Sequence, residues 1–426
     1  MQSHRKTFRN RKIPVGSRPS SERLSPGTRR AFGVGRATQV YRTRLMQDLM
    51  DEEDLDGLAF TSSDYIKFAT NFDVDVSGFE RPCLCVIPRN GRPFAILHEL
   101  SENHWHMSRN LDSIWISEAS FYSEHPRTTQ RLPLTSQWQE LVASRLREAR
   151  LHRARLGTDG GLPARLIEFL PRLHLENVSR QCERLRWIKH DEELSIMRAA
   201  ADLADWAQER YRENIRPGRL VADLDTAMAS LMAHEAAKRM PGADIGIYCW
   251  TLSGPVSASP HGLSPFGNLA GATIKKGHVL ITSVYPAIDG LFIENERTWI
   301  CGPPSKRQIH LFEAARAANE AACGAAISGR PISSIDAAAQ EAFFHRGVDH
   351  LIRHRTGHGL GIGGHDYPID MPFNGNPLQD NMVFSIEPGV YELGIGGFRH
   401  DDTVIVGPTA SIVTKTTRDL KSQTIL

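Results

Sequence analysis

The chain has 426 residues, of which 40% are apolar and 23% are charged, and its formal net charge is +2. This is the composition of an ordinary soluble protein that is long enough for two domains. No apolar run approaches membrane-spanning length, so the sequence excludes a helical membrane protein and a cytoplasmic location is expected.

The charge is distributed unevenly. Residues 1–37 contain ten Lys/Arg and one acid, Glu22, whereas the remaining chain has 41 basic and 48 acidic residues, a net charge of −7. The tail is rich in Arg, Ser, Gly and Pro and is predicted to be a disordered basic extension, with a transit peptide and a nucleic-acid-binding arm as alternatives. Nucleic acid is not the expected partner. The six scattered cysteines predict reduced, buried thiols.

Residues 38–185 alternate short apolar strands with helices, which predicts an N-terminal α/β domain. The dipeptide Asn90-Gly91 indicates a tight turn between two of the strands. We expect helices at 40–53, 136–149 and 162–170, and strands at 57–60, 83–88, 94–97 and 113–116.

Residues 186–426 form the second predicted domain. Arg216-Pro217-Gly218 separates two long amphipathic helices, and Asp289-Gly290 is a strong hairpin signal between two strands. The predicted fold class is therefore α/β (α+β) in two domains. We expect helices at 190–214, 220–238, 306–328 and 332–346, and strands at 245–252, 279–285, 291–300, 382–386 and 397–406.

A loop is expected at residues 354–366, which hold three histidines and five glycines in 13 residues. Histidine titrates near neutral pH and is the commonest metal ligand, while glycines let the backbone approach a ligand closely. The strand that follows carries a single carboxylate, Glu387, and a strand does not bury Glu without a partner. The two stretches together predict a functional site.

The order of three motifs resembles that of the creatinase/aminopeptidase P family of two-domain "pita-bread" enzymes, and the resemblance covers residues 38–426. It implies a creatinase-like N-terminal domain (38–185), a pita-bread catalytic domain (186–426) and a homodimer. The motifs are Thr356-Gly357-His358-Gly359-Leu360-Gly361, Ile386-Glu387-Pro388-Gly389 and Gly397-Phe398-Arg399-His400-Asp401-Asp402-Thr403.

In the metal-dependent members of this family, two Asp, one His and two Glu hold two ions. The resemblance implies that His358 and Glu387 keep the His and the first Glu, and that Asp401 stands at the second Glu. The two Asp positions fall at Ser283 and Glu294. Because a serine hydroxyl is a poor ligand for a divalent cation, the expected metal site is mononuclear, with Glu294, His358, Glu387 and Asp401 around one Mn, Fe or Zn ion.

The residues also allow a metal-free site. Strand alternation places Glu294 and Glu296 on one face of a hairpin together with Ser283. With Glu387 and Asp401 opposite, up to four carboxylates share one pocket, and they cannot all stay ionised without a cation among them. That cation is either a metal or a cationic substrate.

Further residues are expected on the substrate side. Creatinase is similar in lacking the Asp ligands, and its Phe-x-Arg, which comes from the partner subunit, resembles Phe79-Glu80-Arg81; Phe79 and Arg81 are thus expected to bind a substrate carboxylate. His261 and His365 stand at the family's two catalytic histidines, which implies that they manage protons beside Glu296 and Glu387. We expect His354 to orient His358, and we assign His354 and Arg399 to substrate binding.

We predict a homodimeric hydrolase that cleaves a C–N bond in a small amino-acid-like or Xaa-Pro dipeptide-like substrate. An Xaa-Pro peptidase and a creatinase-like amidinohydrolase are the two versions of this prediction. The alternatives are a metal-dependent lyase acting on a small cation such as dimethylsulfoniopropionate, and a catalytically degenerate pita-bread binding module. No membrane partner is expected.

Overall fold

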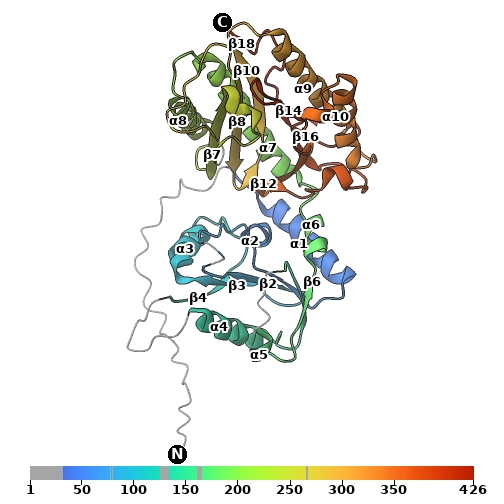
Figure 1. Ribbon diagram of the computed structural model, residues 1–426. Helices are drawn as coiled ribbons and strands as arrows, with labels where there is room; N and C mark the ends of the chain where they lie inside the picture. Colours follow the sequence, from blue (N-terminus) through green and yellow to red (C-terminus); the bar gives the residue numbers. More distant parts are fainter. Residues whose placement is uncertain (1–31, 77, 79, 125–133, 161–165, 265–266) are drawn as a thin grey trace, which may run out of the picture.

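The computed structural model describes residues 32–76, 78, 80–124, 134–160, 166–264 and 267–426. The described chain forms two lobes, each built on its own β-sheet (Figure 1). The predicted basic extension lies outside the described residues up to residue 31. Helix α1 begins at Arg36, two residues before the predicted start of the first domain.

The first lobe is a six-stranded mixed sheet in the order β4-β3-β2-β1-β5-β6, and every strand pair of this sheet lies before residue 185. Fully buried apolar strands such as β1 and β2 form its centre. Its strands are β1 (Gly57–Phe60), β2 (Leu84–Pro88), β3 (Phe94–His98), β4 (Glu118–Tyr122), β5 (Arg155–Thr158) and β6 (His174–Asn177). Its helices are α1 (Arg36–Glu52), α2 (Ser63–Thr70), α3 (Glu102–Asn110), α4 (Leu134–Glu148), α5 (Leu166–Phe169) and α6 (Ser179–Arg184).

The second lobe is a ten-stranded sheet whose main path runs β12-β11-β13-β16-β10-β8-β7, with a separate hairpin of β14 and β15. Its strands are β7 (Ile245–Ser253), β8 (Val279–Ile288), β9 (Leu291–Phe292), β10 (Asn295–Cys301), β11 (Gly357–Gly361), β12 (Gly363–Asp366), β13 (Val383–Ile386), β14 (Gly389–Glu392), β15 (Gly396–Arg399), β16 (Asp401–Ile405), β17 (Ser411–Ile412) and β18 (Thr424–Ile425). Its long helices are α7 (Asp191–Asn214), α8 (Val221–Arg239), α9 (Lys306–Ala325) and α10 (Ser333–His345).

Strand alternation separates the helix-covered face of this sheet from the opposite face. Leu280 and Val284 of β8 and Trp299 of β10 pack in the same core as α7 and α8. The intervening residues of these strands, among them Ser283 and Glu296, point the other way because successive side chains of a strand alternate between faces. The helices thus leave polar side chains of β8 and β10 together on the second face.

Several sequence-based element predictions were wrong. The strand expected at 113–116 lies at Glu118–Tyr122, and the predictions for the first lobe missed α2, α3, β5, β6 and α6. The histidine-rich segment is not a loop: it forms β11 and β12, in which glycines stand where neighbouring backbone comes close. A Cβ at Gly357 would lie 1.9 Å from the Ser385 carbonyl oxygen, so only glycine fits this pairing.

Buried ion pairs join the lobes. The Arg42 guanidinium of α1 lies 2.6 Å from the Glu193 carboxylate of α7, and both side chains are almost fully buried. Arg186, in the segment between the lobes, lies 2.9 Å from Asp366 of β12, donates to the Ile362 carbonyl and lies 3.4 Å from Asp64 of α2. The hairpin of β11 and β12 is therefore fixed against the first lobe.

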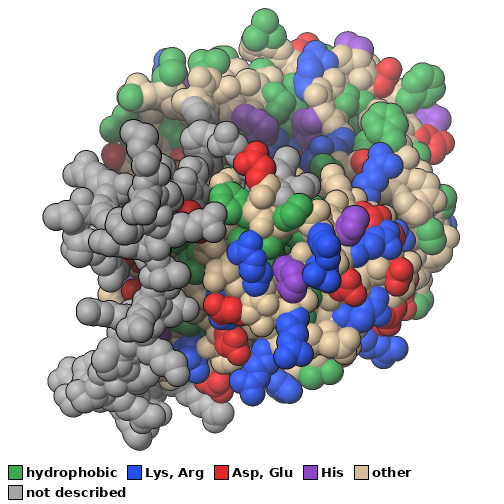
Figure 2. Space-filling model, turned by 90° about the horizontal axis from the view of Figure 1, so that it is seen from below, with side chains coloured by type: hydrophobic (Ala, Val, Ile, Leu, Met, Phe, Trp, Pro, Cys, Tyr) green, Lys and Arg blue, Asp and Glu red, His purple; other side chains and the backbone are tan. Residues whose placement is uncertain are grey.

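Surface charge on the first lobe is mixed in sign, with Lys and Arg side chains lying among Asp and Glu on the face seen from below (Figure 2). Among the described helices, none combines the length and the apolar character needed to cross a bilayer.

The Arg42–Glu193 pair yields a stability prediction. Arg42→Gln leaves Glu193 buried without its cation, and losing one partner of a buried pair costs about 3–5 kcal/mol. We therefore expect the urea unfolding midpoint to fall markedly, as followed by tryptophan fluorescence.

Arg44→Gln on the same helix is the matched control, since its side chain is 80% exposed and its acid partner Asp48 is 3.8 Å away. Equal midpoints for both variants would contradict the structural role of the buried pair.

Candidate active site

Carboxylates from three segments meet on the second face of the large sheet. Glu294 precedes β10, Glu296 lies within it, Glu387 follows β13, and Asp401 begins β16. The strand register pairs Glu296 with Ser283 on one side and with Asp401 on the other, so the predicted residues lie on adjacent strands. The structure thus brings together all four predicted acids.

Glu296 is already neutralised by protein groups. Arg399 donates to it through two nitrogens, with one of these bonds at 2.7 Å, and Ser283 donates from 2.6 Å. The Tyr285 hydroxyl donates to the same carboxylate. With four donors on its two oxygens, Glu296 has little capacity left for a metal or a substrate cation.

Glu294 and Asp401 share a single hydroxyl. Ser385 Oγ lies 2.9 Å from Glu294 Oε2 and 2.8 Å from Asp401 Oδ1, yet it has only one proton to donate. Burial and the neighbouring acids raise the pKa of Glu294 well above its usual range, and burial with the Glu296 charge raises the pKa of Asp401 to about 7. These shifts favour the protonated carboxyl groups, and a bound cation would favour the ionised ones.

His358 points an unused nitrogen at these acids. Its Nε2 has no hydrogen-bond partner and lies 3.6 Å from both Glu294 Oε2 and Glu387 Oε1. Its Nδ1 lies 3.0 Å from the Gly359 carbonyl, which assigns the ring proton to Nδ1 and the lone pair to Nε2. Burial and the nearby His365 lower the pKa of His358 to about 3, so this imidazole is neutral.

Three more histidines surround this centre. The exposed His365 stacks on His358 with ring centroids 3.8 Å apart. His354 contacts the Tyr391 hydroxyl at 2.7 Å rather than His358, and burial lowers the pKa of His354 to about 4. His261 directly follows Pro260, whose carbonyl accepts a hydrogen bond from Arg399, so the chain carries this histidine to the edge of the same site.

The arrangement fits a divalent metal. Ligand atoms of Glu294, His358 and His365 lie within 4.8 Å of one another, and Glu387 Oε1 lies 3.6 Å from His358 Nε2. His358 Nε2 and Asp401 Oδ2 are buried polar atoms with no hydrogen-bond partner, as expected for groups that complete their contacts on an ion. Carboxylate oxygens with one imidazole suit Mn, Fe or Zn.

The predicted clamp for a substrate carboxylate consists of Phe79 and Arg81. Phe79 lies outside the described residues. The Arg81 side chain is engaged by two acids of its own lobe, with its guanidinium 2.7 Å from Glu80 and 2.9 Å from Glu124. Within the chain, Arg399 donates to Glu296, the Tyr391 hydroxyl and the Pro260 carbonyl, and its role in substrate binding stays a prediction.

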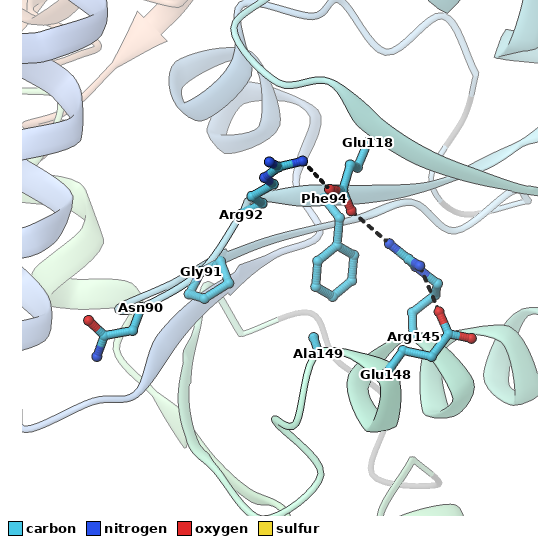
Figure 3. Close-up of a pocket in the computed structure, with 9 residues that line it drawn as sticks. Asn90, Gly91, Arg92, Phe94, Glu118, Arg145, Glu148 and Ala149 are labelled. Atoms are coloured by element: carbon cyan, nitrogen blue, oxygen red, sulfur yellow. Dashed lines mark hydrogen bonds and ion pairs between the residues drawn. The ribbon is translucent and has the colours of Figure 1, made fainter.

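A pocket on the first lobe lies apart from the acid cluster (Figure 3). Phe94 and Arg145 meet there in a cation–π contact of 5.1 Å. Arg145 lies 3.2 Å from Glu118 and 2.7 Å from Glu148, so its charge is already compensated. The pocket belongs to the six-stranded sheet and supplies no side chain to the site.

Two residues of the site were missed by sequence reasoning. Ser385 stands two residues before Glu387 and pairs in register with His358, so period-two alternation along β13 would have placed it on the site face. Tyr391, which links His354 to Arg399, follows from no local pattern because its contacts come from residues 37 and 8 positions away.

Residues 195–408 match metallopeptidase family M24. The chain belongs to this family. An Xaa-Pro dipeptidase of Lactobacillus helveticus is 31% identical over 261 residues, which cover 60% of this chain and 67% of that protein. YkvY of Bacillus subtilis is 31% identical over 236 residues, which are 55% of this chain but only 62% of the relative's length.

Solved M24 structures have the same fold. The prolidase from Thermococcus sibiricus superimposes with a TM-score of 0.75 at 25% identity and covers 91% of this chain and 99% of that one. The predicted family and the two-domain pita-bread fold class are thereby confirmed, and the predicted hydrolase class agrees with a family of metallopeptidases. The names of these relatives give no support to the lyase alternative.

The buried acids predict a pH dependence of stability that a metal reverses. Asp401 has a pKa of about 7 when folded, compared with about 4 in an unfolded chain. The free energy of unfolding that this difference contributes is therefore lost as the pH rises through 7. The buried neutral histidines have the opposite effect, because they lower the stability as the pH falls, but only below about pH 6.5. In chelator, we therefore expect the melting temperature to fall between pH 6.5 and 8, and Mn²⁺ or Zn²⁺ to restore it.

Asp401→Asn is the control because an amide of the same shape does not ionise. Its melting temperature in chelator should depend less on pH than that of the unsubstituted protein. The same slope in both proteins, together with no effect of metal, would contradict the acid-crowding account.

Proposed function

We propose that the protein is a metal-dependent dipeptidase that works with one divalent transition ion held by Glu294, His358, Glu387 and Asp401. The observation that carries the proposal is the unpartnered His358 Nε2, buried at 3.6 Å from two carboxylate oxygens. A neutral imidazole lone pair facing two acids is a ligand set rather than an ion pair.

The proposal of one ion rests on Ser283 and Glu296. Ser283 provides no carboxylate, and its hydroxyl is used as a donor to Glu296. Glu296 in turn is held by Arg399, so the positive charge beside it comes from a guanidinium. The remaining acids, Glu294, Glu387 and Asp401, supply enough negative charge for one ion.

A divalent ion held by these residues would activate water and polarise a peptide carbonyl. Among the ligand acids, Glu387 would be the one best placed to accept a proton, because its side chain is 16% exposed whereas Asp401 is fully buried. Partial burial of the His365 ring and the nearby Arg355 lower its pKa, which favours a neutral imidazole that can accept a proton and pass it toward the leaving amine.

The substrate class follows from the site and from the named relatives, which include an Xaa-Pro dipeptidase. A creatinase-like site would need Glu296 to hold a substrate guanidinium, but Arg399 already occupies that carboxylate. We accordingly propose dipeptides as substrates, Xaa-Pro among them, and a homodimer as the working unit. The homodimer is testable by light scattering.

The test is a metal titration coupled to dipeptide hydrolysis. Chelated protein should be inactive on Ala-Pro and Ala-Ala, and activity should return as one equivalent of Mn²⁺ or Zn²⁺ binds. His358→Ala should lower metal affinity and reduce kcat/KM at least about 100-fold, since it removes a neutral nitrogen that faces two acids.

His345→Ala provides a matched control, because that histidine is 68% exposed at the end of α10. Its metal content and its kcat/KM should remain those of the unsubstituted protein. Full hydrolysis in metal-free protein would refute the proposal, and so would binding of two equivalents of ion with equal affinity.

A further inference from the structure

Arg186, in the segment between the lobes, binds both ends of the short strand that carries His365. Its guanidinium donates to the carbonyl of Ile362, in the turn of the hairpin, and lies 2.9 Å from the Asp366 carboxylate, at the end of β12. The side chains of Arg186 and Asp366 are both almost fully buried. Because a guanidinium is planar and its N–H donors have fixed directions, these two contacts together fix the position and the direction of β12.

Strand β12 needs such support because it stands at one end of the main path of the large sheet. The neighbouring strand β11 pairs with β13 on its other side, where His358 lies opposite Ser385. The pairing of β11 with β12 is irregular, since its register shifts between Gly359 and Gly361. The strand that carries His358 is therefore held from both sides, whereas the strand that carries His365 depends more on contacts outside the sheet.

The side chains of β12 point to two sides. Successive residues of a strand face opposite ways, so His365 and Asp366 point away from each other. His365 stacks on His358 with ring centroids 3.8 Å apart. Asp366 points to Arg186 and also packs against β11, since a Cβ at Gly361 would lie 2.3 Å from Asp366 Oδ2. A displacement of Asp366 would thus displace the histidine next to it.

The first lobe completes the surroundings of the Arg186 guanidinium. Asp64, near the start of α2, lies 3.4 Å from it. The guanidinium carbon also lies 5.3 Å from the centre of the Tyr65 ring of α2 and 5.6 Å from that of the Tyr367 ring, which follows β12. Cation–π contacts with one ring from each lobe favour this position of the charge. The first lobe is thereby connected to His365 through a single side chain.

We propose that Arg186 is a positioning residue for His365, and that Asp64 and Tyr65 of the first lobe hold Arg186 in place for this role. The inference rests on the proposed dipeptidase function, in which His365 passes a proton toward the leaving amine. Metal binding does not depend on this contact, because the ligand His358 lies on a strand that β13 also holds. Loss of the contact therefore slows hydrolysis while the ion stays bound, since a misplacement of about 1 Å greatly reduces the effect of a catalytic group.

The first test is Arg186→Lys, which keeps the charge but loses the planar fork that reaches Ile362 and Asp366 together. In metal-loaded protein, kcat for Ala-Pro should fall about 10-fold or more with little change in KM. Calorimetric titration with Mn²⁺ should give the affinity of the unsubstituted protein. Arg44→Lys is the matched control, because the Arg44 side chain is 80% exposed on α1, and it should leave kcat, KM and Mn²⁺ affinity unchanged.

A second test asks whether Arg186 acts through His365. His365→Ala should itself lower kcat, and adding Arg186→Lys should cause no further loss, because the group that Arg186 positions is already absent. A purely structural role of Arg186 would instead lower kcat equally in both backgrounds and reduce the Mn²⁺ affinity. Asp64→Asn changes a half-exposed side chain, so the fold should be intact, and its smaller loss of kcat should likewise disappear in the His365→Ala background.

The position of His365 can also be measured without turnover. Diethyl pyrocarbonate modifies accessible, neutral imidazoles, and mass spectrometry of the peptides gives the rate at each histidine. Arg186→Lys should raise the rate at His365 at least about 3-fold, because β12 separates from β11 more often. The rate at His345, which is 68% exposed on α10, is the internal control and should not change.

The outcomes separate the two proposals. If the unsubstituted, metal-loaded protein hydrolyses no dipeptide, the dipeptidase proposal fails, and the modification rates still decide whether Arg186 holds His365. If the protein hydrolyses Ala-Pro but Arg186→Lys keeps full kcat, binds Mn²⁺ more weakly, or loses as much kcat in the His365→Ala background, the dipeptidase proposal stands and the positioning role is refuted.

Discussion

The repulsion among buried carboxylates is the constraint on which the rest of this structure depends. Three acids, Glu296, Glu387 and Asp401, offer ligand atoms within 4.8 Å of one another, and Glu294 shares the Ser385 hydroxyl with Asp401. A low-dielectric environment does not hold such charges without compensation. Two arrangements compensate these charges. Arg399 compensates Glu296 permanently, whereas Glu294, Glu387 and Asp401 retain raised pKa values and face a neutral imidazole. The second group is the one that fits an ion.

The scaffold holds this unfavourable arrangement in place through contacts outside it. The hairpin that carries His358 and His365 is fixed by Asp366, whose carboxylate lies 2.9 Å from the buried Arg186. Arg399 also holds the Pro260 carbonyl, next to His261. The side chains that handle protons are therefore positioned by ion pairs and hydrogen bonds with residues far away in the sequence, and one of these, Arg186, also contacts Asp64 of the first lobe.

The residues on strands β8 and β10 distinguish this chain from the metal-ligand pattern that the family resemblance implies. A serine stands at one position where the family resemblance implies an Asp ligand, and the adjacent strand carries Glu296 directly opposite that serine. A carboxylate is thus present near the same place but on the neighbouring strand, where Arg399 reaches it. Trp250 lies one strand further on, opposite the same serine, so an apolar cluster adjoins the acids across β7, β8 and β10.

Local patterns in the sequence were sufficient for the long helices, the Asp289-Gly290 turn and the motifs that identify the family, because helix periodicity, turn dipeptides and motif order are properties of adjacent residues. The family resemblance, rather than local pattern, supplied most of the acids and histidines predicted for the site. Only the tertiary structure showed that Glu296 forms an ion pair with Arg399 and that the Ser385 hydroxyl is shared by two acids. It also showed that His354 contacts Tyr391 rather than His358. Those pairings join residues between 16 and 103 positions apart, and they depend on strand register and packing, which no local pattern encodes.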